Sequence, residues 1–203
     1  MTTINVNLLF KPLNDDTYYR YTTDEETLRE YNNGIKDFTR ALSLRSGFVE
    51  ALFYRGKGKL VLNLYQEAID DFDKAIEARW WHILAYFHRG IAKWALGQHE
   101  NAISDFDKGI GVDVKSERGY KPPVWLARGI AKWNLGRYGS AMVDFDEVIR
   151  LEQDNATAWF LRGSAKAELG RVEESVFDID EAKRLDPDIS SKFNVKEIIS
   201  VRS

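Results

Sequence analysis

The acidic residues with the most regular placement are four pairs of aspartates, the members of each pair standing two positions apart. Paired carboxylates could bind a metal ion or share a proton in acid–base catalysis. On a helix, however, side chains two positions apart point to nearly opposite sides and cannot hold one ion. The pairs also recur, whereas an active site normally occurs once, so we expect no catalytic residue, no metal site and no enzyme activity. The pairs are Asp71/Asp73, Asp105/Asp107, Asp144/Asp146 and Asp178/Asp180.

Basic residues recur with the same regularity. At four places an arginine directly precedes a glycine and is followed, four positions after the arginine, by a lysine. We hypothesise that these cations pair with the repeated aspartates, within one repeat or across the boundary to the next, and so fix the register of the repeats. Losing one partner of a buried pair would cost roughly 3–5 kcal/mol. The residues are Arg55, Arg89, Arg128 and Arg162 with Lys59, Lys93, Lys132 and Lys166.

Other candidates for chemistry are weaker. The three histidines, His82, His88 and His99, form no pair four positions apart on one helix face. DFDKGIGVD and DPDISSKFNVKE resemble the start and the frame of a calcium loop, but both lack the glycine that such a loop needs at its sixth position. We therefore expect no metal and no cofactor.

Composition narrows the class of protein further. A net charge of −3 argues against nucleic acid as the main partner, and the absence of cysteine excludes disulfides and thiol chemistry. The N-terminus has no basic leader before an apolar run, and no apolar run is long enough to cross a membrane. The sequence thus predicts no membrane association and a cytoplasmic location.

The repeated residues belong to a longer internal repeat. Residues 85–110, AYFHRGIAKWALGQHENAISDFDKGI, return as VWLARGIAKWNLGRYGSAMVDFDEVI at 124–149. The glycines Gly56, Gly90, Gly129 and Gly163 stand 34, 39 and 34 residues apart, which gives a period of 34 with one five-residue insertion. Apolar residues recur at three and four, and Leu-Gly separates the two halves, so each repeat is predicted to be a helix hairpin turned by a left-handed glycine or asparagine.

This pattern resembles the tetratricopeptide repeat. The resemblance rests on the 34-residue period, the aromatic four positions before the repeat glycine (Tyr86, Trp125, Trp159), the central Leu-Gly and the small-x-x-x-Phe of the second helix. It implies an all-α, right-handed superhelical solenoid of antiparallel helix hairpins, with about four full repeats, a partial N-terminal repeat and a C-terminal capping helix. The sequence departs from the usual pattern in having a repeat-boundary proline only at Pro187 and a lysine three positions after each repeat glycine.

Three segments are expected along the chain. Residues 1–22 are too apolar for a comfortable disordered tail and should pack on the solenoid, which spans 23–187. Within it, a helix should run from 24 to about 44, and the insertion at 111–123 should form a protruding loop. Residues 188–203 should form a helix, over 189–202, that covers the last apolar face.

The resemblance implies a concave groove lined by the first helices of the repeats. Helical spacing places an unusually apolar set of residues on that face, bordered by Asn134. These residues could simply pack first helix against first helix, or they could bind an apolar or amphipathic segment of a partner. The predicted contact residues are Phe53, Lys57, Phe87, His88, Ile91, Trp94, Leu126, Ile130, Trp133 and Phe160.

We expect a protein-interaction module or scaffold that binds a partner peptide or protein surface in this groove. Two alternatives remain open. One is a self-assembling structural protein, which would form homo-oligomers; the other is a regulatory domain that binds a small molecule between the first helices. Only Lys57 matches the lysines and asparagines that hold the acidic C-termini of heat-shock chaperones, so that ligand is not expected.

Overall fold

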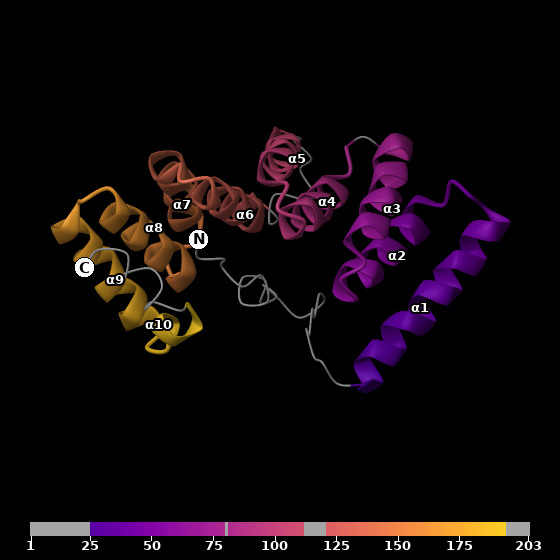
Figure 1. The fold of residues 1–203 in the computed structure, drawn as a ribbon, viewed down its shortest axis with the longest axis horizontal. Helices are drawn as coiled ribbons and strands as arrows, with labels where there is room; N and C mark the ends of the chain where they lie inside the picture. Colours follow the sequence, from indigo (N-terminus) through magenta and orange to yellow (C-terminus); the bar gives the residue numbers. More distant parts are fainter. Residues whose placement is uncertain (1–24, 80, 112–120, 194–203) are drawn as a thin grey trace. The chain divides into compact units, whose positions relative to one another are not determined.

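The computed structural model describes residues 25–79, 81–111 and 121–193, and every regular element in these ranges is a helix (Figure 1). The all-α fold predicted from the repeat is therefore confirmed. The helices are α1 (Glu25–Leu44), α2 (Val49–Val61), α3 (Tyr65–Ala78), α4 (Ile83–Ala95), α5 (His99–Gly111), α6 (Lys121–Asn134), α7 (Tyr138–Leu151), α8 (Ala156–Glu168), α9 (Val172–Leu185) and α10 (Ile189–Lys192).

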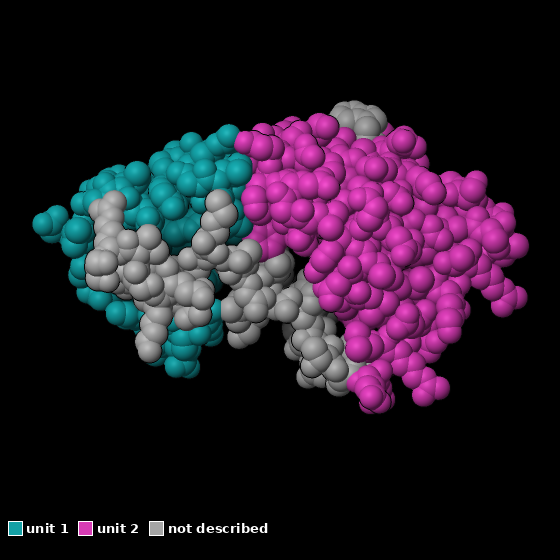
Figure 2. Space-filling view, in the orientation of Figure 1, with its two compact units in different colours: residues 1–11, 121–203 teal, residues 12–120 magenta. Residues whose placement is uncertain are grey.

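The chain divides into two compact units (Figure 2). Helices α1 to α5 belong to the unit of residues 12–120, and α6 to α10 belong to the unit of residues 1–11 and 121–203. The division falls at the five-residue insertion that interrupts the period. Of the loop expected at 111–123, residues 112–120 lie outside the described residues, and α6 already begins at Lys121. Pro122 and Pro123 fit its first turn because the first backbone N–H groups of a helix have no partner within it.

Each repeat is a hairpin of two helices, as the period predicts. α2 packs on α3, α4 on α5, α6 on α7 and α8 on α9. The turns contain Asn63 at φ 60°, Gly97 at 75°, Gly136 at 70° and Gly170 at 77°. At Gly97 the backbone N–H donates to the carbonyl of Trp94, and the next N–H donates to Lys93, which ends α4 and reverses the chain. The predicted left-handed turn is confirmed in all four hairpins.

The repeat glycine sets how closely the two helices approach. A Cβ atom on Gly90 would lie 2.5 Å from Cε1 of Phe106, a ring that is 1% exposed. Gly129 has the same relation to Phe145, with a distance of 2.5 Å. The pattern of glycine in the first helix and phenylalanine in the second thus describes a single contact, which forms the centre of the hairpin.

The ends of the repeat array depart from the hairpin pattern. α1 matches the prediction of a helix from 24 to about 44 and packs on α2, so it stands where the second helix of a repeat would lie. The C-terminal helix begins at the expected residue, but Phe193 is extended, and α10 ends at Lys192. Residues 1–22 and 194–203, on which the predicted N-terminal packing and the rest of the capping helix depend, lie outside the described residues.

No helix in the described ranges is long and apolar enough to cross a membrane.

Candidate functional site

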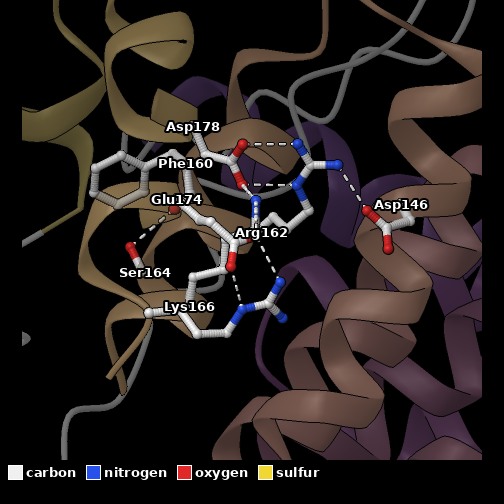
Figure 3. Close-up of polar contacts among 8 residues, drawn as sticks. Asp146, Phe160, Arg162, Ser164, Lys166, Glu174 and Asp178 are labelled. Carbon is white, nitrogen blue, oxygen red and sulfur yellow. Dashed lines mark hydrogen bonds and ion pairs between the residues drawn. The ribbon is translucent and has the colours of Figure 1, made fainter. Parts of the chain in front are cut away.

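The repeated charged residues form one cluster per repeat, seen most clearly in the last hairpin (Figure 3). Asp178 in α9 is fully buried and accepts two hydrogen bonds from the Arg162 guanidinium, both of 2.7 Å. Lys166, one turn further along α8, places its Nζ 2.7 Å from the same carboxylate. The first helix therefore supplies two cations to one carboxylate of the second helix. Asp71, Asp105 and Asp144 are held in the same way by Arg55 and Lys59, Arg89 and Lys93, and Arg128 and Lys132.

The same arginines also connect successive repeats. Nη1 of Arg162 reaches back 2.7 Å to Asp146 in α7, as Figure 3 shows. Nη1 of Arg89 donates to Asp73 in α3 in the same way. In the pairs Asp71/Asp73 and Asp144/Asp146, the first aspartate thus binds within its repeat, and the second binds the following repeat. The pairing of repeated arginines and lysines with repeated aspartates, called the ladder from here on, was predicted from the sequence. It is confirmed both within a repeat and between successive repeats.

The charged side chains of the ladder are engaged with one another rather than available for other chemistry. Burial alone would lower the pKa of Arg162, but its hydrogen bonds to Asp178 and Asp146 outweigh burial and raise the pKa above its ordinary value. Arg89 behaves alike, between Asp105 and Asp73. Among the described residues, no group of three histidine, aspartate or glutamate side chains could hold a metal ion.

An aromatic ring supports the arginine in three repeats. The Arg162 guanidinium lies 4.6 Å from the centre of the Trp159 ring, and Arg128 lies 4.5 Å from that of Trp125. In the second repeat Tyr86 holds Arg89 more loosely, at 5.4 Å. The aromatic that precedes the repeat glycine therefore stacks on the ladder arginine, which orients its planar donors toward the carboxylates.

In the unit of residues 12–120, the predicted contact residues lie on α2 and α4. Phe53 packs its ring on His82 and His88, at 4.7 and 5.5 Å between ring centres, and Phe87 packs 6.2 Å from Phe106. The side chains are less than a tenth exposed, with the exception of half-buried Lys57. The buried residues of this set are Phe53, Phe87, His88, Ile91 and Trp94.

The remaining predicted contact residues lie in the other unit, with Leu126, Ile130 and Trp133 on α6 and Phe160 on α8. All are buried. Trp133 meets Tyr138 edge to face at 4.9 Å, and Phe160 stacks on Phe193 at 4.9 Å. These contacts agree with the first of the two interpretations left open by the sequence, packing within the chain. Binding of a partner by the same helices is not tested by the contacts.

The surroundings of Lys57 and His88 lower the pKa of both side chains. Burial lowers the pKa of Lys57 from 10.5 to about 8, although its ammonium lies 5.6 Å from the centre of the Phe53 ring. His88 is 4% exposed, and burial, followed by the charge of Lys57 and His82, holds its pKa well below the ordinary 6.5. His88 is therefore neutral at pH 7.

Two polar groups at the ends of first helices have no hydrogen-bond partner in the described structure. They are the indole N–H of Trp94 at the end of α4 and the side-chain amide of Asn134 at the end of α6, and the atoms concerned are buried. A buried polar group without a partner costs about 1–3 kcal/mol. The sequence analysis placed Trp94 in the expected groove and Asn134 at its border. It could not predict that their polar groups lack hydrogen-bond partners, because that depends on side-chain geometry.

Comparison with known families identifies the repeat. Two profiles described as tetratricopeptide repeat match residues 83–113 and 126–188. This chain is a tetratricopeptide repeat protein. The matches cover the second, third and fourth hairpins, and they agree with the period, the turn glycines and the glycine–phenylalanine contact. A search of curated proteins finds no match to the chain.

Solved tetratricopeptide repeat structures share the fold at low sequence identity. A crystal structure of MamA has a TM-score of 0.73 and 18% identity, over 82% of this chain and 95% of that one. YrrB, described as a tetratricopeptide repeat protein with an unusual peptide-binding site, has a TM-score of 0.70 and 21% identity, over 85% and 86%. The first such domain of Spaghetti (RPAP3), bound to the HSP90 peptide SRMEEVD, has a TM-score of 0.50 and 24% identity, over 58% and 90%.

Proposed function

We propose that this tetratricopeptide repeat protein is a non-catalytic interaction module that binds a peptide segment of a partner protein along the first helices of its repeats. The observation that carries the proposal is that each unit holds, at the end of a first helix, a polar side chain without a hydrogen-bond partner in the described structure: Trp94 in α4 and Asn134 in α6. A peptide backbone supplies both donors and acceptors, so a peptide bound to either unit could satisfy the indole N–H of Trp94 or the side-chain amide of Asn134.

The distribution of charge supports a peptide rather than a nucleic acid. Binding of nucleic acid depends on exposed cations that neutralise phosphates. The four ladder arginines and their lysines instead engage buried aspartates. YrrB and the RPAP3 domain, which share the fold, are described with a peptide-binding site and a bound peptide, respectively.

The test begins with selection of binding peptides from a random displayed library on the full chain. The affinity of the best peptide is then measured by calorimetry for Trp94→Phe and Asn134→Leu. Trp94→Phe keeps an aromatic ring but removes the indole N–H, so we expect about tenfold weaker binding from the loss of about 1.4 kcal/mol. Asn134→Leu should also weaken binding, yet the variant should be as stable as the wild type or more so, because it removes an unsatisfied buried amide.

Phe177→Ser is the control. Phe177 is 67% exposed on α9, a second helix, so this variant should bind the peptide as the wild type does. If Trp94→Phe and Asn134→Leu both retain the wild-type affinity, the proposed surface is wrong.

A further inference from the structure

α1 has the sequence of a second helix, and no described residue forms the first helix that would normally cover it. In register with the repeats, Gly34 corresponds to Ala68, Asp37 to Asp71 and Phe38 to Phe72. Ala68 and Phe72 are fully buried, whereas Phe38 is partly exposed. A Cβ atom built on Gly34 would meet no atom of the described residues within 4 Å. No described side chain therefore fills this face of α1 at Gly34.

The carboxylate on this face, Asp37, has no cation partner among the described residues. Asp71 is 1% exposed and holds both Arg55 and Lys59. Asp37 is exposed, and no described residue forms an ion pair with it. The contact between α1 and the following repeat is present, because Arg55 donates a hydrogen bond of 3.2 Å to Thr39. This face lies on the side where a preceding first helix belongs.

α1 does not begin with the hairpin turn of the other repeats. α3 begins at Tyr65, which corresponds to residue 31, but α1 begins six residues before that position, at Glu25. In the 34-residue register, the first six residues of α1 correspond to Lys59 to Leu64. In the following repeat, those residues end α2 and form the turn to α3. Arg29 stands where Asn63 has a φ of 60°, so the residue that reverses the chain is replaced by one that continues the helix.

We propose that α1 binds an α-helix of a partner protein that carries arginine, a small residue directly after it, and lysine four positions after the arginine. Four first helices of this chain present that arrangement to a second helix, and each meets a buried aspartate at the place of Asp37. The arginine and lysine of the partner would bind Asp37, and its small residue would allow close approach to Phe38. This surface is separate from that of the proposed function and does not depend on it.

The probe is a synthetic peptide of residues 155–170, labelled, acetylated and amidated, which carries Arg162, Gly163 and Lys166 behind its capping Asn155. Its binding to the full chain is measured by fluorescence anisotropy. We expect saturable binding that Gly34→Leu weakens at least tenfold, because the leucine fills this face of α1. Gly139→Leu is the matched control: Gly139 also lies in a helix with no described atom within 4 Å, and its variant should bind normally.

A charge test follows with Asp37→Asn and a peptide carrying Arg162→Ala. Each change should weaken binding about five- to tenfold, and the two together should cost less than the product of the single effects, because they remove one interaction. Circular dichroism of Gly34→Leu should show unchanged helix content.

Three results would overturn the proposal. The first is no saturable binding to the full chain, and the second is equal binding by Gly34→Leu and the wild type. The third is a solution mass of the full chain that rises with concentration and falls back in Gly34→Leu, which would assign the face to a second copy of the chain.

Discussion

At the residue scale, the charged side chains of this protein serve its architecture. Each buried aspartate is satisfied by an arginine and a lysine from the other helix of its hairpin, as Asp178 is by Arg162 and Lys166. A buried carboxylate is stable only when it is paired and hydrogen-bonded. The repetition of aspartate through the sequence therefore reflects repeated construction, and the spacing of two separates a contact within the repeat from a contact between repeats.

His88 provides a prediction for the pH dependence of stability. Its pKa is held well below 6.5 in the folded chain, while in the unfolded chain the imidazole gains a proton as the pH falls through 6.5. The contribution of neutral His88 to the free energy of unfolding is then fully present above pH 6.5 and is lost as the pH falls below it. The loss between neutral pH and pH 5.5 is on the order of 1 kcal/mol.

The measurement is urea unfolding of the wild type and of His88→Leu at pH 7.5 and 5.5. Between these pH values, the wild type should lose more stability than the variant does, by an amount on the order of 1 kcal/mol. The lowered pKa of His82 adds to the pH dependence of both proteins, so only the difference between them reports His88. Equal losses would show that His88 can be protonated in the folded chain.

At the scale of the elements, the contact between the repeat glycine and the phenylalanine of the second helix controls the packing of the first three hairpins. Gly90→Ala would place a methyl carbon 2.5 Å from the buried Phe106 ring, so the helices must separate or the ring must move. Overpacking of this kind costs about 1–3 kcal/mol. We expect the melting temperature, measured by circular dichroism, to fall by about 2–12 °C.

Gly139→Ala is the control, because Gly139 lies in α7 with no described atom within 4 Å. Alanine is the better helix former by about 1 kcal/mol, so this variant should be as stable as the wild type or more so. A Gly90→Ala variant as stable as this control would contradict the close packing described for the hairpin.

Much of this construction could be predicted from the sequence because it is periodic. The glycines and the aspartate–cation ladder each recur at fixed positions, so a pattern of letters identifies the turns at Gly97 and Gly136 and the partners of Asp105. What does not recur was harder to predict. The helix from 24 to about 44 was predicted, whereas the early start of α6 at Lys121 departs from the period. The unpartnered atoms of Trp94 and Asn134 depend on side-chain geometry, which the sequence does not encode in any local pattern.

At the scale of the whole molecule, structural and binding roles are assigned to different helices. In each of the two units the second helices carry the buried aspartates and the phenylalanines that hold the hairpins together. The first helices carry the ladder cations on one side and the predicted contact residues on another. A partner bound as we propose would therefore meet α2 and α4 in one unit, or α6 and α8 in the other, and leave α3, α5, α7 and α9 unchanged.

Amide hydrogen exchange of the full chain, with and without a saturating amount of the best selected peptide, tests this assignment most directly. Short exchange times report local opening rather than global unfolding. Slower exchange in α4 and α6, around Trp94 and Asn134, is the result predicted by peptide binding along the first helices. Slower exchange confined to the second helices α3, α5, α7 or α9 would contradict it.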